Sequence, residues 1–308
     1  MKKTATREAY GITLAKLAQQ NPNILVLDAD LTGSTKTGEV KKIVPSQHFN
    51  MGIAEGNMMG VAAGLAASGN IVFASSFAMF AAGRAFEQIR NSIAYPKLNV
   101  KICATHAGLT VGEDGASHQS IEDIALMRSI PGMVVISPAD APSTDAAIQA
   151  VAQYDGPCYV RLGRMAIGNV YETKVPFTIG KGNVLQAGKD VAIIATGIMV
   201  EAAMKACTQL KQLGYTPTIV DMHTIKPIDK DLICELAKTH ELFVTCEEHN
   251  VIGGLGSAVS EVLSKHIPRK MVMIGIKDTF GESGEPKELL EKYGLTAKDI
   301  VEAVVSSK

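Results

Sequence analysis

The chain has 308 residues, of which 46% are hydrophobic and 20% charged, and its net charge at pH 7 is −1. This composition is that of a folded globular protein long enough for two domains, and the charge gives no reason to expect binding to nucleic acid or to an anionic membrane. The nearest approach to a membrane helix, residues 58–67, falls well short of the roughly 18 apolar residues that such a helix needs. The five cysteines are widely spaced without a Cys-x-x-Cys pair, which indicates reduced thiols in a cytoplasmic protein.

The first half of the chain alternates short β-branched runs with longer helical patterns. Strands are expected at Asn23–Asp28, Ile71–Ala74, Val100–Ala104, Met133–Ile136 and Cys158–Arg161. Helices are expected at Ala54–Ala67, Ala82–Ala94, Ser120–Ser129 and Ser143–Tyr154. Apolar strands joined by helices predict an α/β, doubly wound domain on a mostly parallel sheet with right-handed crossovers.

A stretch without helical periodicity, residues 171–185, separates this half from the second. Beyond it, strands are expected at Val191–Ala195, Thr218–Asp221, Leu242–Glu247 and Met271–Ile276. Helices are expected at Met199–Leu213, Lys230–Thr239 and Gly256–His266, followed by two short C-terminal helices. We therefore expect two doubly wound α/β domains, residues 1–170 and a smaller one over 186–308, joined by a linker over 171–185.

Polar and aromatic side chains follow the strands of the first half where each strand ends. Because the carboxyl ends of parallel strands meet at one edge of a sheet, where open α/β sheets bind ligands, these side chains should lie together. The residues concerned are Asp28, Asp30, Phe77, Phe80, His106, Arg161 and Arg164. Glu55 stands at a helix start, and the stretch from His106 to Gln119 adds a second histidine, two carboxylates and three glycines that let the backbone approach a ligand.

Each of these residues also has an ordinary structural explanation. The negative charge of Glu55 at a helix start would interact favourably with the helix dipole. Two phenylalanines at helical or turn spacing are commonly core residues. The arginines could be solvated charges, and the histidine stretch could be a polar loop with one helix cap. The joint occurrence of all these groups at one sheet edge favours a binding site over the separate explanations.

Five motifs together resemble transketolase, a thiamine-diphosphate enzyme. From Thr6 to Lys308 the chain is similar to the C-terminal half of that family. The motifs are Asp-Ala-Asp-Leu-Thr-Gly-Ser at 28–34, Gly-Ile-Ala-Glu at 52–55, Phe-Ala-Met-Phe at 77–80, the stretch from His106 to Gln119, and Glu-Glu-His-Asn-Val-Ile-Gly-Gly-Leu-Gly at 247–256. The resemblance implies a pyrimidine-binding domain over residues 1–170 and a transketolase C-terminal domain over 186–308.

The resemblance also implies a role for each site residue. Glu55 would donate a hydrogen bond to the far nitrogen of the cofactor's pyrimidine ring, which requires a protonated carboxyl kept so by burial against an apolar ring. Contacts to the cofactor would come from Glu55, Phe77, Phe80, Asp30 and Ile53. His118 would act on the reacting carbonyl as a second catalytic group, and Asp114 would bind a sugar hydroxyl. The substrate phosphate would be held by Arg7, Ser34, His106 and Arg164, the last preferred over Arg161 by its spacing.

Two departures from the family pattern carry consequences. The usual transketolases have a further aromatic three residues after Phe80, where this chain has Gly83, so the stacking wall should be thinner there. The Gly-Asp-Gly…Asn motif that binds the diphosphate and its metal is missing, and no asparagine lies between residues 100 and 168. We therefore expect a split enzyme that acts on sugar phosphates. Mg²⁺ or another divalent cation would bind on an N-terminal partner subunit, and the assembly would be a dimer of heterodimers.

Other functions remain open on the sequence. A 2-oxoacid dehydrogenase beta subunit would lack the Gly-Glu-Asp-Gly-x-Ser-His stretch, and deoxyxylulose-phosphate synthase is normally a single chain of twice this length. A non-catalytic scaffold would have no need of Glu55, His106, Asp114 and His118. In the second half, the glycine-rich turn at 253–256 favours a plain strand-to-helix connection over an anion cradle, and residues 247–249 favour a structural or contact role.

Overall fold

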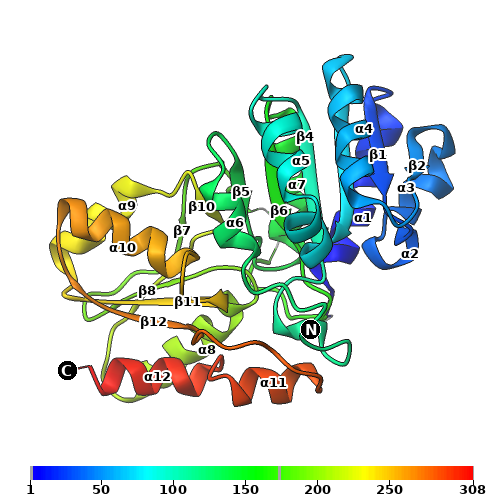
Figure 1. Ribbon diagram of the computed structural model, residues 1–308. Coiled ribbons are helices and arrows are strands. Elements are labelled where there is room, and N and C mark those ends of the chain that lie inside the picture. The colour runs from blue at the N-terminus through cyan, green and yellow to red at the C-terminus, as the bar shows by residue number, and fades with distance from the viewer. Residues whose placement is uncertain (1–2, 173–174, 308) are drawn as a thin grey trace.

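The computed structural model describes residues 3–172 and 175–307, which form two sheets (Figure 1). In spatial order the seven strands of the first sheet are β10 (Thr224–Lys226), β5 (Val134–Ile136), β6 (Cys158–Arg161), β4 (Val100–Thr105), β3 (Ile71–Phe77), β1 (Ile24–Asp28) and β2 (His48–Asn50). All neighbours are parallel except β10, which runs antiparallel to β5. The first sheet is thus mostly parallel, as predicted.

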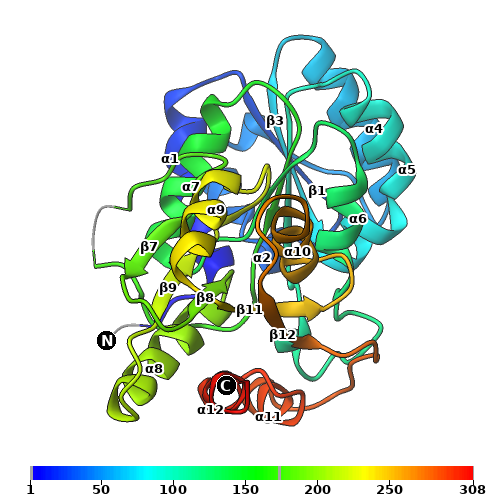
Figure 2. The same cartoon turned by 90° about the vertical axis from the view of Figure 1, so that its left-hand side faces the viewer.

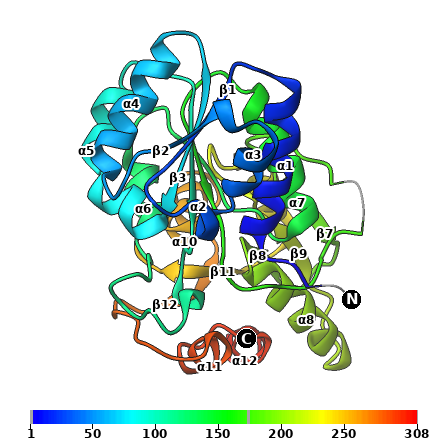
Figure 3. The same cartoon turned by 90° about the vertical axis from the view of Figure 1, so that its right-hand side faces the viewer.

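Helices cover both faces of this sheet (Figures 2 and 3). One face carries α4 (Glu55–Ala67), α5 (Phe86–Gln88) and α6 (Asp123–Ser129), and the other carries α1 (Thr6–Gln20) and α7 (Ala141–Gln153). Two π-helical turns, η2 (Met79–Arg84) and η3 (Ile89–Ala94), flank α5. Shorter elements are α2 (Thr32–Thr35), α3 (Gly38–Ile43), η1 (Pro45–Gln47) and η4 (Leu109–Val111). The alanines on the buried side of α4 let it pack closely on β3.

The second sheet is also sandwiched between helices. Its order is β12 (Lys270–Ile276), β11 (Leu242–Asn250), β8 (Ala192–Ala195), β9 (Thr218–Asp221) and β7 (Asn183–Gln186), with only β7 antiparallel to its neighbour. Helices α9 (Lys230–Thr239) and α10 (Leu255–His266) lie between this sheet and the first part of the chain. On the far face lie α8 (Met199–Gln212), α11 (Pro286–Lys292) and α12 (Ala297–Val305) (Figure 1).

One hydrophobic core runs between the two halves. It joins Ile124 and Met127 of α6 to Phe243 and Leu255 of the second half. The sheets are also linked through the chain, because β10 follows β9 in sequence yet pairs with β5 of the first sheet. None of the helices within residues 3–172 and 175–307 is long and apolar enough to cross a membrane.

Most predicted elements match the observed ones within three residues. Thr218–Asp221 and Lys230–Thr239 are matched at both ends. The predicted helix over Ala82–Ala94 is instead two π-helical turns around α5, beginning at Met79. Several elements were not predicted: the helices α1, α2 and α3 and the strands β2, β7 and β10.

Candidate active site

The predicted meeting of strand ends is confirmed. Strands β6, β4, β3 and β1 are consecutive parallel neighbours, so their carboxyl ends share one edge of the first sheet. The loop after β6 also contacts the start of α1, since Gly163 N–H donates to Thr6 Oγ1 at 2.7 Å. This is the edge at which the sequence predicts the site residues.

Two phenylalanines and two histidines form a ring cluster at this edge. Phe77 stacks on His106 with ring centres 3.8 Å apart and on Phe80 at 6.0 Å. His118 meets Phe80 edge-on at 5.3 Å and Phe77 at 6.3 Å. Phe77 therefore lies between both histidines, and the cluster brings together four of the expected site residues.

His106 is held neutral by its surroundings. Burial and the nearby Arg7 and Arg164 lower its pKa from 6.5 to about 3. Arg7 Nη1 lies 3.2 Å from His106 Nε2, which must accept this hydrogen bond because arginine has no acceptor. The imidazole proton is then on Nδ1, 2.9 Å from Thr105 Oγ1. Arg7 also donates to the backbone carbonyl of Ser34 at 2.8 Å, so Ser34 contributes through its main chain.

Two arginines at the end of β6, Arg161 as its last residue and Arg164 just after it, have different environments. Arg161 is buried, donates from Nε to Asp123 at 2.8 Å and from Nη2 to the carbonyls of Ser120 and Glu248, and so supports the interior. Arg164 is partly exposed, pairs with Glu113 at 2.7 Å and donates to the carbonyl of Val111. Only Arg164 has a partner on the surface that a ligand can replace.

Glu55 is buried at the start of α4 and has two side-chain partners. Ser76 Oγ donates to its Oε1 at 3.1 Å, and Arg84 Nη1 donates to its Oε2 at 2.6 Å. The guanidinium of Arg84 also lies 4.6 Å from the centre of the Phe80 ring. Next to Arg84, a Cβ on Gly83 would meet the methyl of Met79 at 2.6 Å, so Met79 fills that side of the turn.

Three of the other expected site residues are exposed. Ile53 is 77% exposed, and Asp30, also exposed, exchanges hydrogen bonds of 3.1 Å with Asn50. Asp114 is exposed in the loop after η4. In this chain these three side chains are therefore in contact with solvent.

The second half of the chain supports the loop that carries both histidines. Thr110 N–H donates to Glu248 Oε1 at 2.7 Å, and Gln119 Nε2 donates to the carbonyl of Glu282 at 2.9 Å. Gly108 has φ +83°, and a Cβ there would lie 2.3 Å from the Glu248 carboxyl carbon, so glycine is required. Burial raises the pKa of Glu248 to about 7.

The glycine turn of the second half is closed by its own strand. Glu247 of β11 accepts from the N–H groups of Leu255 and Gly256 at 2.7 and 2.8 Å, which occupies the start of α10. A Cβ on Gly254 would lie 1.9 Å from Glu247 Oε2. The interpretation as a strand-to-helix connection is confirmed, because the helix start already holds a carboxylate.

Comparison with known proteins identifies the family. Residues 2–169 match the pyrimidine-binding domain of transketolase, and residues 180–300 match its C-terminal domain. A protein of Methanocaldococcus jannaschii described as a transketolase C-terminal section is 53% identical over 97% of this chain and 95% of its own length. This chain belongs to the transketolase family. It is a subunit of a split transketolase and corresponds to the C-terminal section, which confirms the resemblance drawn from the motifs.

Further relatives of this transketolase subunit differ in length and in the substrates that their names give. The 6-deoxy-6-sulfo-D-fructose transketolase subunit of Clostridium sp. is 41% identical over 96% of this chain and 92% of its own. The transketolase of Rattus norvegicus is 36% identical over 98% of this chain but only 49% of its own. A solved structure described as a split gene transketolase, inactive beta4 tetramer, has a TM-score of 0.92 and 57% identity, covering 98% of this chain and 97% of that one.

The pyrimidine-binding domain implies a thiamine-diphosphate enzyme, and the transketolase site fits that cofactor. A planar group with N–H donors, the Arg84 guanidinium, bonds the buried Glu55 carboxyl and covers the Phe80 ring. An aminopyrimidine ring has the same planar form and donors. Within residues 3–172 and 175–307, no group of three or more His, Cys, Asp or Glu side chains is arranged to hold a metal ion.

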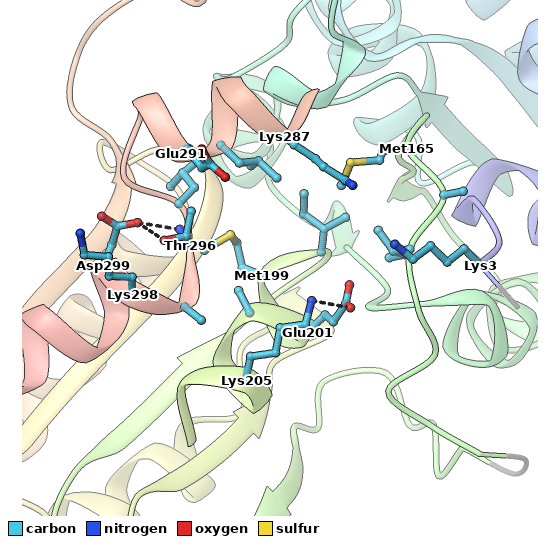
Figure 4. A pocket seen from close by; sticks show the side chains of 17 residues that line it. Lys3, Met165, Met199, Glu201, Lys205, Lys287, Glu291, Thr296, Lys298 and Asp299 are labelled. Carbon is cyan, nitrogen blue, oxygen red and sulfur yellow. Dashed lines mark hydrogen bonds and ion pairs between the residues drawn. The ribbon is translucent and has the colours of Figure 1, made fainter. Parts of the chain in front are cut away.

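A cavity of about 680 Å³ is lined in part by Met165, Ala166 and Ile167, which follow Arg164 in the chain (Figure 4). It is bounded by Lys3 and by side chains of α8, α11 and α12, and it includes none of the expected site residues. Its ionic groups are partly paired, since Lys205 binds Glu201 at 2.7 Å and Asp299 caps the start of α12. We assign no ligand to it.

The sequence did not single out Arg84 and Glu113 as residues of the transketolase site. Arg84 stands four residues after Phe80, one helical turn away, and this spacing is the signal that could have placed a cation over the ring. Glu113 was noted only as one carboxylate of the histidine stretch, 51 positions from Arg164. No local pattern connects such a pair.

Proposed function

We propose that this subunit takes part in transferring a two-carbon ketol unit from a ketose phosphate to an aldose phosphate with thiamine diphosphate. The observation that carries the proposal is the buried Glu55 carboxyl, which is bonded by the Arg84 guanidinium that covers Phe80 in the ring cluster. The cofactor would supply a thiazolium carbon that, once deprotonated, accepts and passes on the ketol unit.

Toward the cofactor, the residues of this chain bind and orient. Glu55 would hold a proton on the carboxyl and donate it in a hydrogen bond to the ring nitrogen, which favours the imino form of the ring. Phe77 and Phe80 would hold the ring by stacking. The exposed side chains of Ile53 and Asp30 would complete the contact from the outer side.

Toward the substrate, the loop after β4 and the cations act together. His118, edge-on to Phe80, would exchange a proton with the reacting carbonyl, and Asp114 would bind a sugar hydroxyl. Arg7 and Arg164, near the neutral His106 and the Ser34 turn, form a cationic patch suited to a phosphate group. The buried Nε of Arg7 has no hydrogen-bond partner within the described residues, which leaves a donor available there.

The family assignment and the exposed apolar side chains of this subunit both support assembly with a partner. A split transketolase implies an N-terminal partner subunit, and we propose that this partner supplies the ligands for the diphosphate and for Mg²⁺ or another divalent cation. Ile53 and Phe49 are exposed near the cofactor-side edge, as expected of a surface that a partner covers. Two such pairs would form a dimer of heterodimers.

Reconstitution tests this proposal. The isolated subunit should bind thiamine diphosphate weakly and show no ketol transfer, and both should appear when the N-terminal subunit and Mg²⁺ are added. Calorimetry measures the binding, and a coupled assay on sugar phosphates measures the transfer. Tight cofactor binding by the isolated subunit would contradict the assignment of the diphosphate ligands to the partner.

A further inference from the structure

The guanidinium of Arg84 stands in front of the acid proposed to activate the cofactor. It bonds Glu55 Oε2 at 2.6 Å and lies over the Phe80 ring. The Glu55 side chain is 1% exposed, whereas that of Arg84 is 49% exposed, so the arginine separates the acid from solvent. A planar ligand that reaches Glu55 across the face of Phe80 would meet this guanidinium first.

We propose that Arg84 is an exchangeable partner of Glu55, which holds the carboxylate in the cofactor-free subunit and moves into solvent when the aminopyrimidine ring takes its place. This inference rests on the proposed function. The guanidinium and the ring compete because both are planar, carry N–H donors and stack on aromatic faces. Ser76 bonds the other carboxylate oxygen, Oε1, so the carboxyl keeps its orientation while its partner changes.

The exchange carries a proton with it. Glu55 Oε2 accepts a hydrogen bond from the Arg84 guanidinium, whereas a carboxyl that donates a hydrogen bond to the ring must carry a proton. One proton is therefore taken up from solvent for each cofactor bound. The groups that face this region are Ser76 of β3, Arg84 of η2 and, across Phe80, the imidazole of His118 from the loop after η4.

Calorimetry of the reconstituted two-subunit enzyme tests the exchange. Thiamine diphosphate is titrated with Mg²⁺ present, in two buffers of different ionisation enthalpy, which yields both affinity and proton uptake. Wild type should take up close to one proton. Arg84→Met should bind the cofactor roughly tenfold more tightly, because no ion pair has to break. It should also take up clearly less than one proton per cofactor, because removal of the cation favours the neutral form of a buried carboxyl.

Two further variants separate this role from a general effect. Arg90→Met removes an exposed arginine from the next turn, where it donates to Asn91, and should match wild type in affinity and uptake. Arg84→Lys keeps the charge and should restore the proton uptake.

An Arg84→Met enzyme with equal or weaker affinity and unchanged proton uptake would overturn the exchange. Failure of the proposed function looks different, because the wild-type complex itself would then not bind thiamine diphosphate. Thermal unfolding of each variant checks that the fold is retained.

Discussion

Two buried glutamates can be compared by the kind of partner that each has: Glu247 of β11, which bonds the start of α10, and Glu55, the first residue of α4. Glu247 is bonded by two backbone N–H groups of α10 and is fully enclosed. Glu55, at the start of α4, is bonded by Ser76 and by the half-exposed side chain of Arg84. A backbone partner cannot leave without unfolding the helix start, whereas a side chain can rotate away. The first glutamate is therefore a fixed support and the second is available for exchange with a ligand.

Arg161, at the end of β6, and Arg164, just after it, show the same difference between a fixed and an exposed partner. Arg161 is fixed by the buried Asp123 and by two backbone carbonyls. Arg164 pairs with the exposed Glu113, and we propose that a substrate phosphate replaces this partner. In both comparisons, the residue that we propose to serve function is the one whose pairing involves an exposed side chain.

The largest effect should come from Glu55. We expect Glu55→Ala to slow hydrogen–deuterium exchange at the thiazolium carbon by at least about a hundredfold in the reconstituted enzyme, because the ring loses its hydrogen-bond donor. Subunit assembly should persist, since Glu55 makes no backbone contact that closes a helix. Unchanged exchange would mean that Glu55 only stabilises the helix dipole.

Glu247 should show the opposite behaviour. Glu247→Ala leaves two buried N–H groups without an acceptor, so we expect a loss of about 2–4 kcal/mol in the free energy of unfolding. Urea unfolding of the subunit measures this loss. If Glu247→Ala were as stable as wild type but failed to activate the cofactor, Glu247 would have the functional role and not the structural one.

Arg164 and Asp114 should affect substrates selectively. Loss of a charge-assisted hydrogen bond costs about 1.5–3 kcal/mol, so Arg164→Ala should raise KM for phosphorylated sugars by roughly ten- to a hundredfold and affect free acceptors far less. Asp114→Ala should keep the phosphate preference and erode discrimination between sugars of opposite configuration.

Steady-state kinetics on matched phosphorylated and free acceptors decides the matter, with Arg161→Met as a control for loss of stability. An Arg164→Ala enzyme equally impaired toward both classes would show that phosphate is bound elsewhere.

The smallest effect concerns His106 and pH. Its pKa is about 3 in the folded chain and 6.5 in the unfolded chain, so between these values only the unfolded chain binds the proton. The stability due to a neutral His106 is complete above pH 6.5 and is lost as the pH falls toward 3. In His106→Asn, the slope of unfolding free energy against pH below 6.5 should decrease by at most about 1.4 kcal/mol per pH unit. Parallel slopes for variant and wild type in urea titrations would contradict this assignment.

The sequence predicts the fold better than it predicts the contacts of the site. Helix α9 has an apolar stripe with charged residues opposite, and β9 is a short β-branched run, so local patterns define both. Helix α1 was missed because its buried side includes Thr6, Gly11 and Thr13, which do not form an apolar stripe. The π-helical turn of η2 has no local signature that separates it from an α-helix, and it sets the direction of Arg84.

The site residues themselves were found through short motifs, but their partners were not. Arg84 lies 29 positions from Glu55, and Glu248 lies 138 positions from Thr110. Such pairs form only when distant segments pack, so a single sequence holds no pattern that connects them. The exchangeable or fixed character of a partner is visible only in three dimensions.

Strand β10 has a consequence for cutting the chain into parts. It contributes the outermost strand of the first sheet, pairing with β5, although it comes from residues 224–226. A fragment that stops near residue 170 would leave β5 as an open edge whose backbone N–H and C=O groups are unpaired, and such edges recruit strands from other molecules. The first half made alone would therefore tend to aggregate, and during synthesis its sheet stays unfinished until more than fifty further residues have been added.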